Sequence, residues 1–174
     1  SRQACMIGAN LLPQHFNASQ LGVKAELKQD FMQRMGLGTQ ARSRVPLIGI
    51  VSRLVPQKGF DLVAGAAPAL VAAGARIVAL GSGDVGLVAG MRAIAAARPG
   101  SVAMVERFDR DLARRIYAGA DLFLMPSRFE PCGQGQMIAL RYGTPPVVRR
   151  TGCLHDSVVD AGERFRDREL IQVA

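Results

Sequence analysis

The chain of 174 residues carries a formal net charge of +8, and 49% of its residues are hydrophobic. That hydrophobic content excludes an intrinsically disordered chain, which combines few apolar residues with a high net charge. Arg, Lys, Gly or Pro interrupts each apolar run before it reaches the roughly 20 residues of a membrane span, so we expect no membrane partner. The N-terminal residues also lack the basic and apolar segments of a secretory signal. These features predict a soluble domain of ordinary size.

Arginine supplies almost all of the positive charge, because the chain has only three lysines. A basic surface suits a nucleic acid, a membrane surface or a phosphorylated small molecule. Binding to nucleic acid is disfavoured, since the arginines are dispersed and aromatic residues, which stack on bases, make up only 5% of the chain. We therefore expect no nucleic-acid partner.

The three cysteines, Cys5, Cys132 and Cys153, stand far apart and form no C-x-x-C motif. An odd number at such spacing disfavours a disulfide framework or a structural zinc site and favours a reducing compartment. His15 and His155 are the only histidines, and neither stands at motif spacing from a second metal-ligating residue. We therefore expect no metal and no cofactor.

Residues 1–45 are predicted to form a leader, one helix and a linker. Apolar residues at every fourth position from Leu27 predict a helix over 23–35, and Gly36 follows it at the position of a C-cap glycine. A short basic linker at 39–44 then leads into a segment of different character.

From residue 46 onward, short apolar runs alternate with helical patterns. The predicted strands are 47–51, 76–80, 102–105, 121–125 and 146–148. The predicted helices are 62–73, which Pro68 should kink or shorten, then 85–97, 112–118, 133–142 and a turn at 154–159. This alternation is typical of an α/β fold with a doubly wound parallel sheet, Rossmann-like, over 46–160. An irregular charged tail is predicted over 161–174.

Arg53 and Lys58 flank the turn that follows the first predicted strand. In open parallel sheets, ligands bind outside the carboxyl ends of the strands, so we examine the residues that follow each strand. Two cations beside a glycine that opens a helix suit a diphosphate. The alternative is a pair of solvated surface cations.

Residues 127–135, which follow the fourth strand, combine a carboxylate with two glycines at a helix start. Gly133 and Gly135 leave backbone N–H groups open to an anion. Glu130 is suited to accept hydrogen bonds from sugar hydroxyls or to stabilise positive charge at an anomeric carbon. Its alternative role is a carboxylate that satisfies the helix N-terminus.

Two other turns are less specific. The glycines of 81–84 suit a phosphate, but a lone G-x-G more often marks a tight turn, which we favour. Phe108 follows the third strand and is either a platform that stacks on a base or a core residue.

Three segments together resemble one family. Residues 51–62 contain S-R-L-x-x-Q-K-G-x-D-L, residues 126–144 contain P-S-R-F-E-P-C-G with A-L-R-Y-G-T, and residues 146–156 contain P-V-V-R-R-T-G-x-L-x-D. The same motifs occur, in the same order and at the same separations, in bacterial glycogen synthases and plant starch synthases. Residues 11–24 are also similar to the segment that precedes this domain in that family.

The resemblance implies the C-terminal half of a two-domain (GT-B) retaining glucosyltransferase, truncated here. Such enzymes transfer glucose from ADP-glucose to the non-reducing end of an α-1,4-glucan without a metal. By motif position, Arg53 and Lys58 bind the diphosphate, Glu130 is the catalytic residue at the glucose, and Phe108 stacks on adenine. The backbone that surrounds the sugar and phosphates is that of Cys132, Gly133, Gln134 and Gly135.

The sequence departs from the family pattern at several positions. Gln134 and Gly135 replace the commoner Leu-Thr or Leu-Ser, so the hydroxyl contact to phosphate is absent. Cys153 replaces a second glycine, and it costs about 1–2 kcal/mol if that position requires a positive φ. Ile138 stands where the superfamily has a second glutamate, so ribose recognition is not assigned to it.

The family's N-terminal domain has no counterpart in the chain, and we expect the chain alone to be inactive in transfer. Two alternatives stay open. One is a truncated remnant that binds nucleotide or glucan without turnover, and the other is a related GT-B glycosyltransferase with another sugar nucleotide. The resemblance implies a bacterial cytoplasmic location, or a plastid if the source is a plant.

Overall fold

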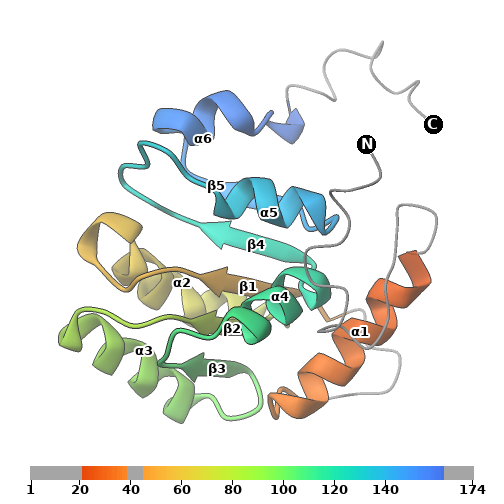
Figure 1. The fold of residues 1–174 in the computed structure, drawn as a ribbon. Coiled ribbons are helices and arrows are strands. Elements are labelled where there is room, and N and C mark those ends of the chain that lie inside the picture. The colour runs from red at the N-terminus through yellow and green to blue at the C-terminus, as the bar shows by residue number, and fades with distance from the viewer. Residues whose placement is uncertain (1–20, 39–44, 163–174) are drawn as a thin grey trace.

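The computed structural model of the chain describes residues 21–38 and 45–162. Five parallel strands form one sheet in the order β3-β2-β1-β4-β5, with helices on both faces (Figure 1). The strands are β1 (Leu47–Val51), β2 (Arg76–Leu80), β3 (Val102–Val105), β4 (Leu122–Met125) and β5 (Pro146–Val148). The helices are α1 (Leu21–Arg34), the 3-10 turn η2 (Pro56–Lys58), α2 (Phe60–Ala72), α3 (Val85–Ala97), α4 (Arg110–Gly119), α5 (Gly135–Arg141) and α6 (Gly152–Ser157). The predicted doubly wound parallel sheet is confirmed.

Five of the eleven predicted elements have the bounds that the structure shows, and the other six are present with shifted ends. Four strands and α3 begin and end at the predicted residues, because each is a short apolar or amphipathic run bounded by turn residues. Helix α4 begins two residues early, since the side chain of Asp109 accepts hydrogen bonds from the backbone N–H groups of Asp111 and Leu112. The predicted leader before α1, the linker at 39–44 and the tail beyond 162 lie outside the described residues.

Two of the shifted helices are explained by tertiary contacts. Helix α2 continues past Pro68 to Ala72, so the proline does not shorten it, because residues on both sides of the proline pack against the sheet. The alternative effect, a kink at Pro68, stays a prediction. Helix α5 begins at Gly135 and not at 133, because Gly133 makes hydrogen bonds to side chains instead of entering the helix. Both outcomes depend on contacts with residues distant in the sequence.

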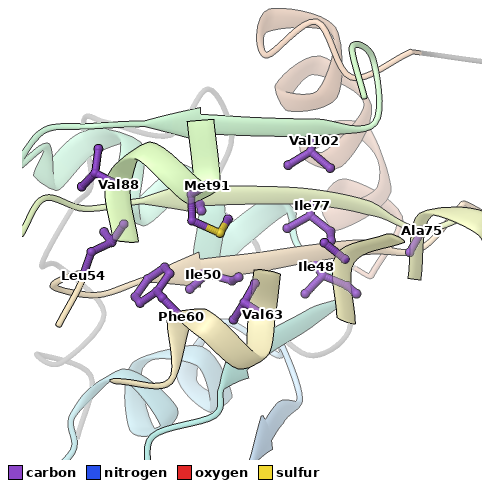
Figure 2. Packing of buried hydrophobic residues seen from close by; sticks show 12 residues of the cluster. Ile48, Ile50, Leu54, Phe60, Val63, Ala75, Ile77, Val88, Met91 and Val102 are labelled. Carbon is purple, nitrogen blue, oxygen red and sulfur yellow. The ribbon is translucent and has the colours of Figure 1, made fainter. Parts of the chain in front are cut away.

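Side chains alternate across the strands, so each strand contributes to two apolar layers. Ile48, Ile50 and Ile77 lie on the face covered by α2 and α3, where they pack with Phe60 and Met91 (Figure 2). The opposite face, covered by α1 and α4, contains Leu47, Val78, Leu80, Phe31 and Ile116. The core therefore lies on both sides of the central strands β1 and β2.

Helix α1 belongs to this core although it precedes the first strand. Phe31 and Met32 are each 3% exposed and pack against the sheet and α4. Lys28 pairs with Asp121 at 2.6 Å, and the same carboxylate accepts a hydrogen bond from the backbone N–H of Leu47. These contacts join α1 to the starts of β1 and β4.

The order in which strands are added to the sheet reverses at β1. Strand β2 lies on one side of β1 and β4 lies on the other, so the loops that follow β1 and β4 lead to helices on opposite faces. Ligands of open α/β sheets bind at such a switch point, outside the carboxyl ends of the strands. The candidate site is therefore expected at the carboxyl ends of β1 and β4.

Candidate functional site

The loops that follow β1 and β4 are joined by hydrogen bonds. The side-chain amide of Gln57 donates to the backbone oxygen of Phe129 at 2.8 Å, and the backbone N–H of Arg128 donates to the backbone oxygen of Gln57 at 2.8 Å. At Gly59, where φ is 70°, a Cβ atom would lie 2.4 Å from the backbone oxygen of Pro126. A side chain cannot be accommodated there, so glycine allows the two loops to meet.

Lys58 and Glu130, both predicted for the site, form an ion pair between these loops. Their side chains are largely buried, with 16% exposed for Lys58 and 7% for Glu130. Ser127 donates its hydroxyl hydrogen to the same carboxylate oxygen, Oε2 of Glu130, at 3.2 Å. Because α5 begins only at Gly135 and its N-cap residue is Gln134, Glu130 does not cap that helix. The structure supports neither the helix-capping role of Glu130 nor a solvated Lys58.

A second ion pair, which the motif positions did not reveal, joins the loop that follows β4 to the first turn of α2. The guanidinium of Arg128 donates two hydrogen bonds to Asp61, at 2.7 and 2.6 Å, and one to the backbone oxygen of Pro56 at 3.0 Å. The hydrogen bonds from Arg128 lower the pKa of Asp61 to about 2. The sequence did contain one signal for this pair, because Asp61 and Arg128 put opposite charges into the two motif segments.

Arg53 is exposed, and its side chain makes no hydrogen bond or ion pair with the residues that the structure describes. It follows β1 directly, and the next residue, Leu54, is held by backbone pairing with Gly83. The ion pairs of Lys58 and Arg128 are internally neutral, so Arg53 supplies the uncompensated positive charge of this group.

The turn at 81–84 connects the loop that follows β1 to the start of α3. The backbone N–H of Leu54 donates to the oxygen of Ser82 at 3.0 Å, and the N–H of Asp84 donates to the oxygen of Leu54 at 2.7 Å. The carboxylate of Asp84 accepts a hydrogen bond from the N–H of Leu87 and caps α3. The favoured interpretation as a tight turn agrees with these contacts.

Phe108 is 86% exposed, so its alternative role as a core residue is wrong. The residue lies between the end of β3 and Asp109, the N-cap of α4, where the chain turns outward. Strand β3 is separated from β1 by β2, and the structure does not bring the ring into contact with Lys58 or Glu130. Its exposure leaves the ring accessible to a ligand.

Residues 132–135, predicted to surround the sugar and phosphates, are held by contacts with α6. The backbone N–H of Gly133 donates to Sγ of Cys153 at 2.9 Å. The side chain of Gln136, which is 1% exposed, donates to the oxygen of Gly133 at 2.8 Å and to the hydroxyl of Ser157 at 3.1 Å. The N–H of Gly133, which was expected to face an anion, therefore faces a thiol.

Cys153 does not carry the strain that was expected if its position required a positive φ. The residue lies within helix α6, and the positive φ of 49° belongs to Gly152. A Cβ atom on Gly152 would lie 2.4 Å from the backbone oxygen of Glu130, whereas Cys153 donates its N–H to that same oxygen at 3.2 Å. The family pattern has glycine at both positions, and the fold requires it at the first, which is Gly152 here.

Within the described residues, no three His, Cys, Asp or Glu side chains gather as a metal site. None of the helices in the part of the chain that the structure describes is long and apolar enough to cross a membrane. The charged groups at the carboxyl ends of β1 and β4 are thus two ion pairs and a free guanidinium. This set can bind an anion beside a buried carboxylate.

Comparison with known proteins gives a consistent assignment. The family model for glycosyl transferases group 1 matches residues 45–171. The chain is 52% identical over 149 residues to the glycogen synthase of Anaeromyxobacter dehalogenans strain 2CP-1, covering 86% of this chain and 31% of that protein. It is 57% identical over 115 residues to the glycogen synthase of Halorhodospira halophila, covering 66% of this chain and 24% of that protein.

A solved structure agrees in sequence and in fold. The catalytic domain of starch synthase IV from Arabidopsis thaliana, bound to ADP and acarbose, is 40% identical with a TM-score of 0.82, and the match covers 87% of this chain and 31% of that chain. The chain thus spans about a quarter to a third of the length of these relatives. It belongs to the group 1 glycosyl transferases, in the branch of the glycogen and starch synthases.

Proposed function

We propose that this chain forms the nucleotide-sugar-binding part of a retaining glucosyltransferase that transfers glucose from ADP-glucose to the non-reducing end of an α-1,4-glucan. Similarity to bacterial glycogen synthases, and to a starch synthase bound to ADP and acarbose, supports the proposal. Because the chain covers 31% of the starch synthase chain, the donor, the glucan acceptor and a second GT-B domain on the acceptor side are parts of the proposal. So is a bacterial cytoplasmic location, or a plastid in a plant.

The meeting of Lys58 with Glu130 at the switch point, beside the free guanidinium of Arg53, carries this proposal. Reaction at a nucleotide sugar separates charge, because the diphosphate leaves with negative charge while positive charge develops at the anomeric carbon. Arg53 and Lys58 would stabilise the departing diphosphate. Glu130 would accept hydrogen bonds from sugar hydroxyls and stabilise the positive charge. The ion pair between Lys58 and Glu130 supports this assignment, because it brings the required cation and carboxylate next to each other.

Phe108 supplies the remaining element of the proposal. Its exposed ring follows β3, at the same sheet edge as the residues that follow β1 and β4. Stacking of a base on an aromatic ring contributes about 1–3 kcal/mol. We assign adenine of the donor to this ring, with the backbone of residues 132–135 closer to the sugar.

Titration calorimetry with ADP, ADP-glucose and UDP-glucose tests the assignment. Arg53→Ala should weaken ADP binding about 10- to 100-fold, because a hydrogen bond to a charged group contributes about 1.5–3 kcal/mol. Arg34→Ala is the matched control, since Arg34 is an exposed arginine on α1 that pairs only with Asp30 among the described residues. Equal affinity in Arg53→Ala and the unchanged chain would contradict the diphosphate assignment. If UDP-glucose binds more tightly than ADP-glucose, the donor is UDP-glucose and not ADP-glucose.

A further inference from the structure

Two cysteines that stand far apart in the sequence meet beside Glu130. Sγ of Cys153 accepts the backbone N–H of Gly133 at 2.9 Å, and Cys132 is the residue before that glycine. Cys132 is exposed, Cys153 is partly buried, and both are free thiols. The sulfur of Cys153 therefore lies against the peptide that links residues 132 and 133.

Peptide geometry converts this contact into a distance between the two cysteines. In a trans peptide the N–H points to the same side as the Cα atom of the preceding residue, and the described residues contain no cis peptide. A sulfur 2.9 Å from the nitrogen of Gly133 therefore lies roughly 4 Å from Cα of Cys132. Adding the reach of the Cys153 side chain places the two Cα atoms within roughly 7 Å of each other, and disulfides span Cα distances of about 4.4–6.8 Å.

The backbone around both cysteines is held in place from several directions. Cys153 donates its N–H to the oxygen of Glu130 at 3.2 Å, and its own oxygen accepts the hydroxyl of Ser157 at 2.6 Å. Gln136 connects that hydroxyl to the oxygen of Gly133. This closed set of hydrogen bonds keeps the start of α6 against residues 130–133. The proximity of the two backbone segments that carry the cysteines thus follows from the fold and not from one side-chain rotamer.

We propose that Cys132 and Cys153 are a reversible dithiol–disulfide pair, oxidised by a low-molecular-weight disulfide such as oxidised glutathione. The thiolate of exposed Cys132 attacks one sulfur of the glutathione disulfide, forming a mixed disulfide and releasing one glutathione thiolate. The thiolate of Cys153 then attacks Sγ of Cys132, and the second glutathione leaves. The two cysteines lose two protons and two electrons, and one disulfide reagent is reduced to two thiols.

Oxidation should also weaken binding of the donor, and this part rests on the proposed function. The disulfide would tie the loop that carries Glu130 to α6 and keep a sulfur at the N–H of Gly133. That N–H could then not turn toward a sugar or phosphate oxygen. Loss of one hydrogen bond to a charged group predicts about tenfold weaker binding of ADP-glucose to the oxidised chain.

Peptide mapping tests the pairing directly. Trypsin cleaves after Arg128, Arg141 and Arg150, so the two thiols fall in separate peptides, 129–141 and 151–164. In a Cys5→Ser background, which removes the third thiol, treatment with oxidised glutathione should link these peptides with the loss of two hydrogen atoms. Dithiothreitol should separate them again. Cys132→Ala and Cys153→Ala should each abolish the linked species.

The linking rate in guanidinium chloride is the control for the fold. Linking should be at least tenfold faster in the folded chain than in the unfolded one, and equal rates would overturn the proposal. Separate glutathione adducts on the two peptides, without a linked species, would overturn it as well.

Calorimetry of the reduced and oxidised chain with ADP-glucose then measures whether oxidation weakens binding. Equal affinities would overturn that part of the proposal. If the reduced chain binds no nucleotide, the proposed function fails, while the peptide map still decides the disulfide.

Discussion

The half of the domain formed by β1, β2 and β3 with α2 and α3 is held together differently from the half formed by β4, β5, α5 and α6. The first half contains a large cluster of buried apolar residues (Figure 2). In the second half, Phe123 of β4 and Ala139 of α5 form a much smaller buried cluster with Tyr117 of α4. The buried polar residues of the described chain, which are Ser127, Glu130, Gln136 and Thr144, all lie in this second half.

This difference separates stability from positioning. Apolar burial is favourable without regard to direction, so the first half contributes stability without fixing individual groups. Hydrogen bonds act only over short distances and at defined angles, and the ion pairs of the site are also hydrogen-bonded, so these contacts hold individual side chains in one place. The second half uses them to fix Glu130 and the backbone of residues 132–135. The catalytic machinery that we propose therefore lies where the apolar core is smallest.

The largest expected effect is the loss of apolar packing in the first half. Ile77 is fully buried in the centre of the sheet, and Ile77→Ala should lower the free energy of unfolding by about 2–5 kcal/mol because it leaves a cavity. Urea denaturation measures this loss, with Ile77→Val as the control at about 0.5–1.5 kcal/mol. The ADP affinity of the folded protein should not change. A loss for Ile77→Ala below that of Ile77→Val would contradict the role of this cluster.

Breaking the ion pair of the second half should have the next largest effect. Lys58→Met leaves Glu130 buried without its cation, which should lower the free energy of unfolding by about 3 kcal/mol. Adding Glu130→Gln should restore part of this loss, with a coupling of about 0.5–3 kcal/mol in a double-mutant cycle. Arg34→Met, which breaks an exposed pair, is the control. Equal losses in Lys58→Met and Arg34→Met would show that burial adds nothing to this pair.

A smaller loss is expected at Thr144, which precedes β5 and joins the second half to α1 and α4. Its hydroxyl donates to the backbone oxygen of Tyr117 at 2.6 Å and accepts from Nζ of Lys24 at 2.6 Å. Thr144→Val keeps the shape but removes the hydroxyl, which should cost about 1–3 kcal/mol because buried partners lose a hydrogen bond. Thr144→Ser should retain most of the stability. Thermal unfolding of the two variants compares them, and a lower melting temperature for Ser than for Val would refute the hydrogen-bond role.

The smallest effect is expected at the exposed pair of Asp61 and Arg128, and it depends on pH. The folded chain holds the pKa of Asp61 at about 2, below the ordinary value of 3.8, through hydrogen bonds from Arg128. The pair therefore contributes its full stability above pH 3.8 and loses it as the pH falls toward 2. Denaturant titrations of the unchanged chain and of Asp61→Asn should converge over that interval. A difference between them that stays constant down to pH 2 would exclude this linkage.

Local patterns were sufficient for much of the fold. Strands β1, β2, β3 and β5 and helix α3 have the predicted bounds, because each depends on neighbouring residues and on the glycines and prolines that end it. The prediction of α5 failed at its start for the opposite reason. Gly133 is drawn away from the helix by Cys153 and Gln136, and no local pattern contains the first of these partners. The residues next to Phe108 in the sequence likewise did not determine whether its ring is buried or exposed.

Motif positions pointed to Arg53, Lys58, Glu130 and the segment 132–135, and the residues of the two motif segments do meet. Their partners required the tertiary structure. Lys58 and Glu130 stand 72 positions apart, and Asp61 and Arg128 stand 67 positions apart. Such pairs form because β4 lies beside β1, which places the loops that follow these two strands at one edge of the sheet. Strand order is a property of the whole packed chain, since it depends on how all helices cover both faces, and so no single segment encodes it.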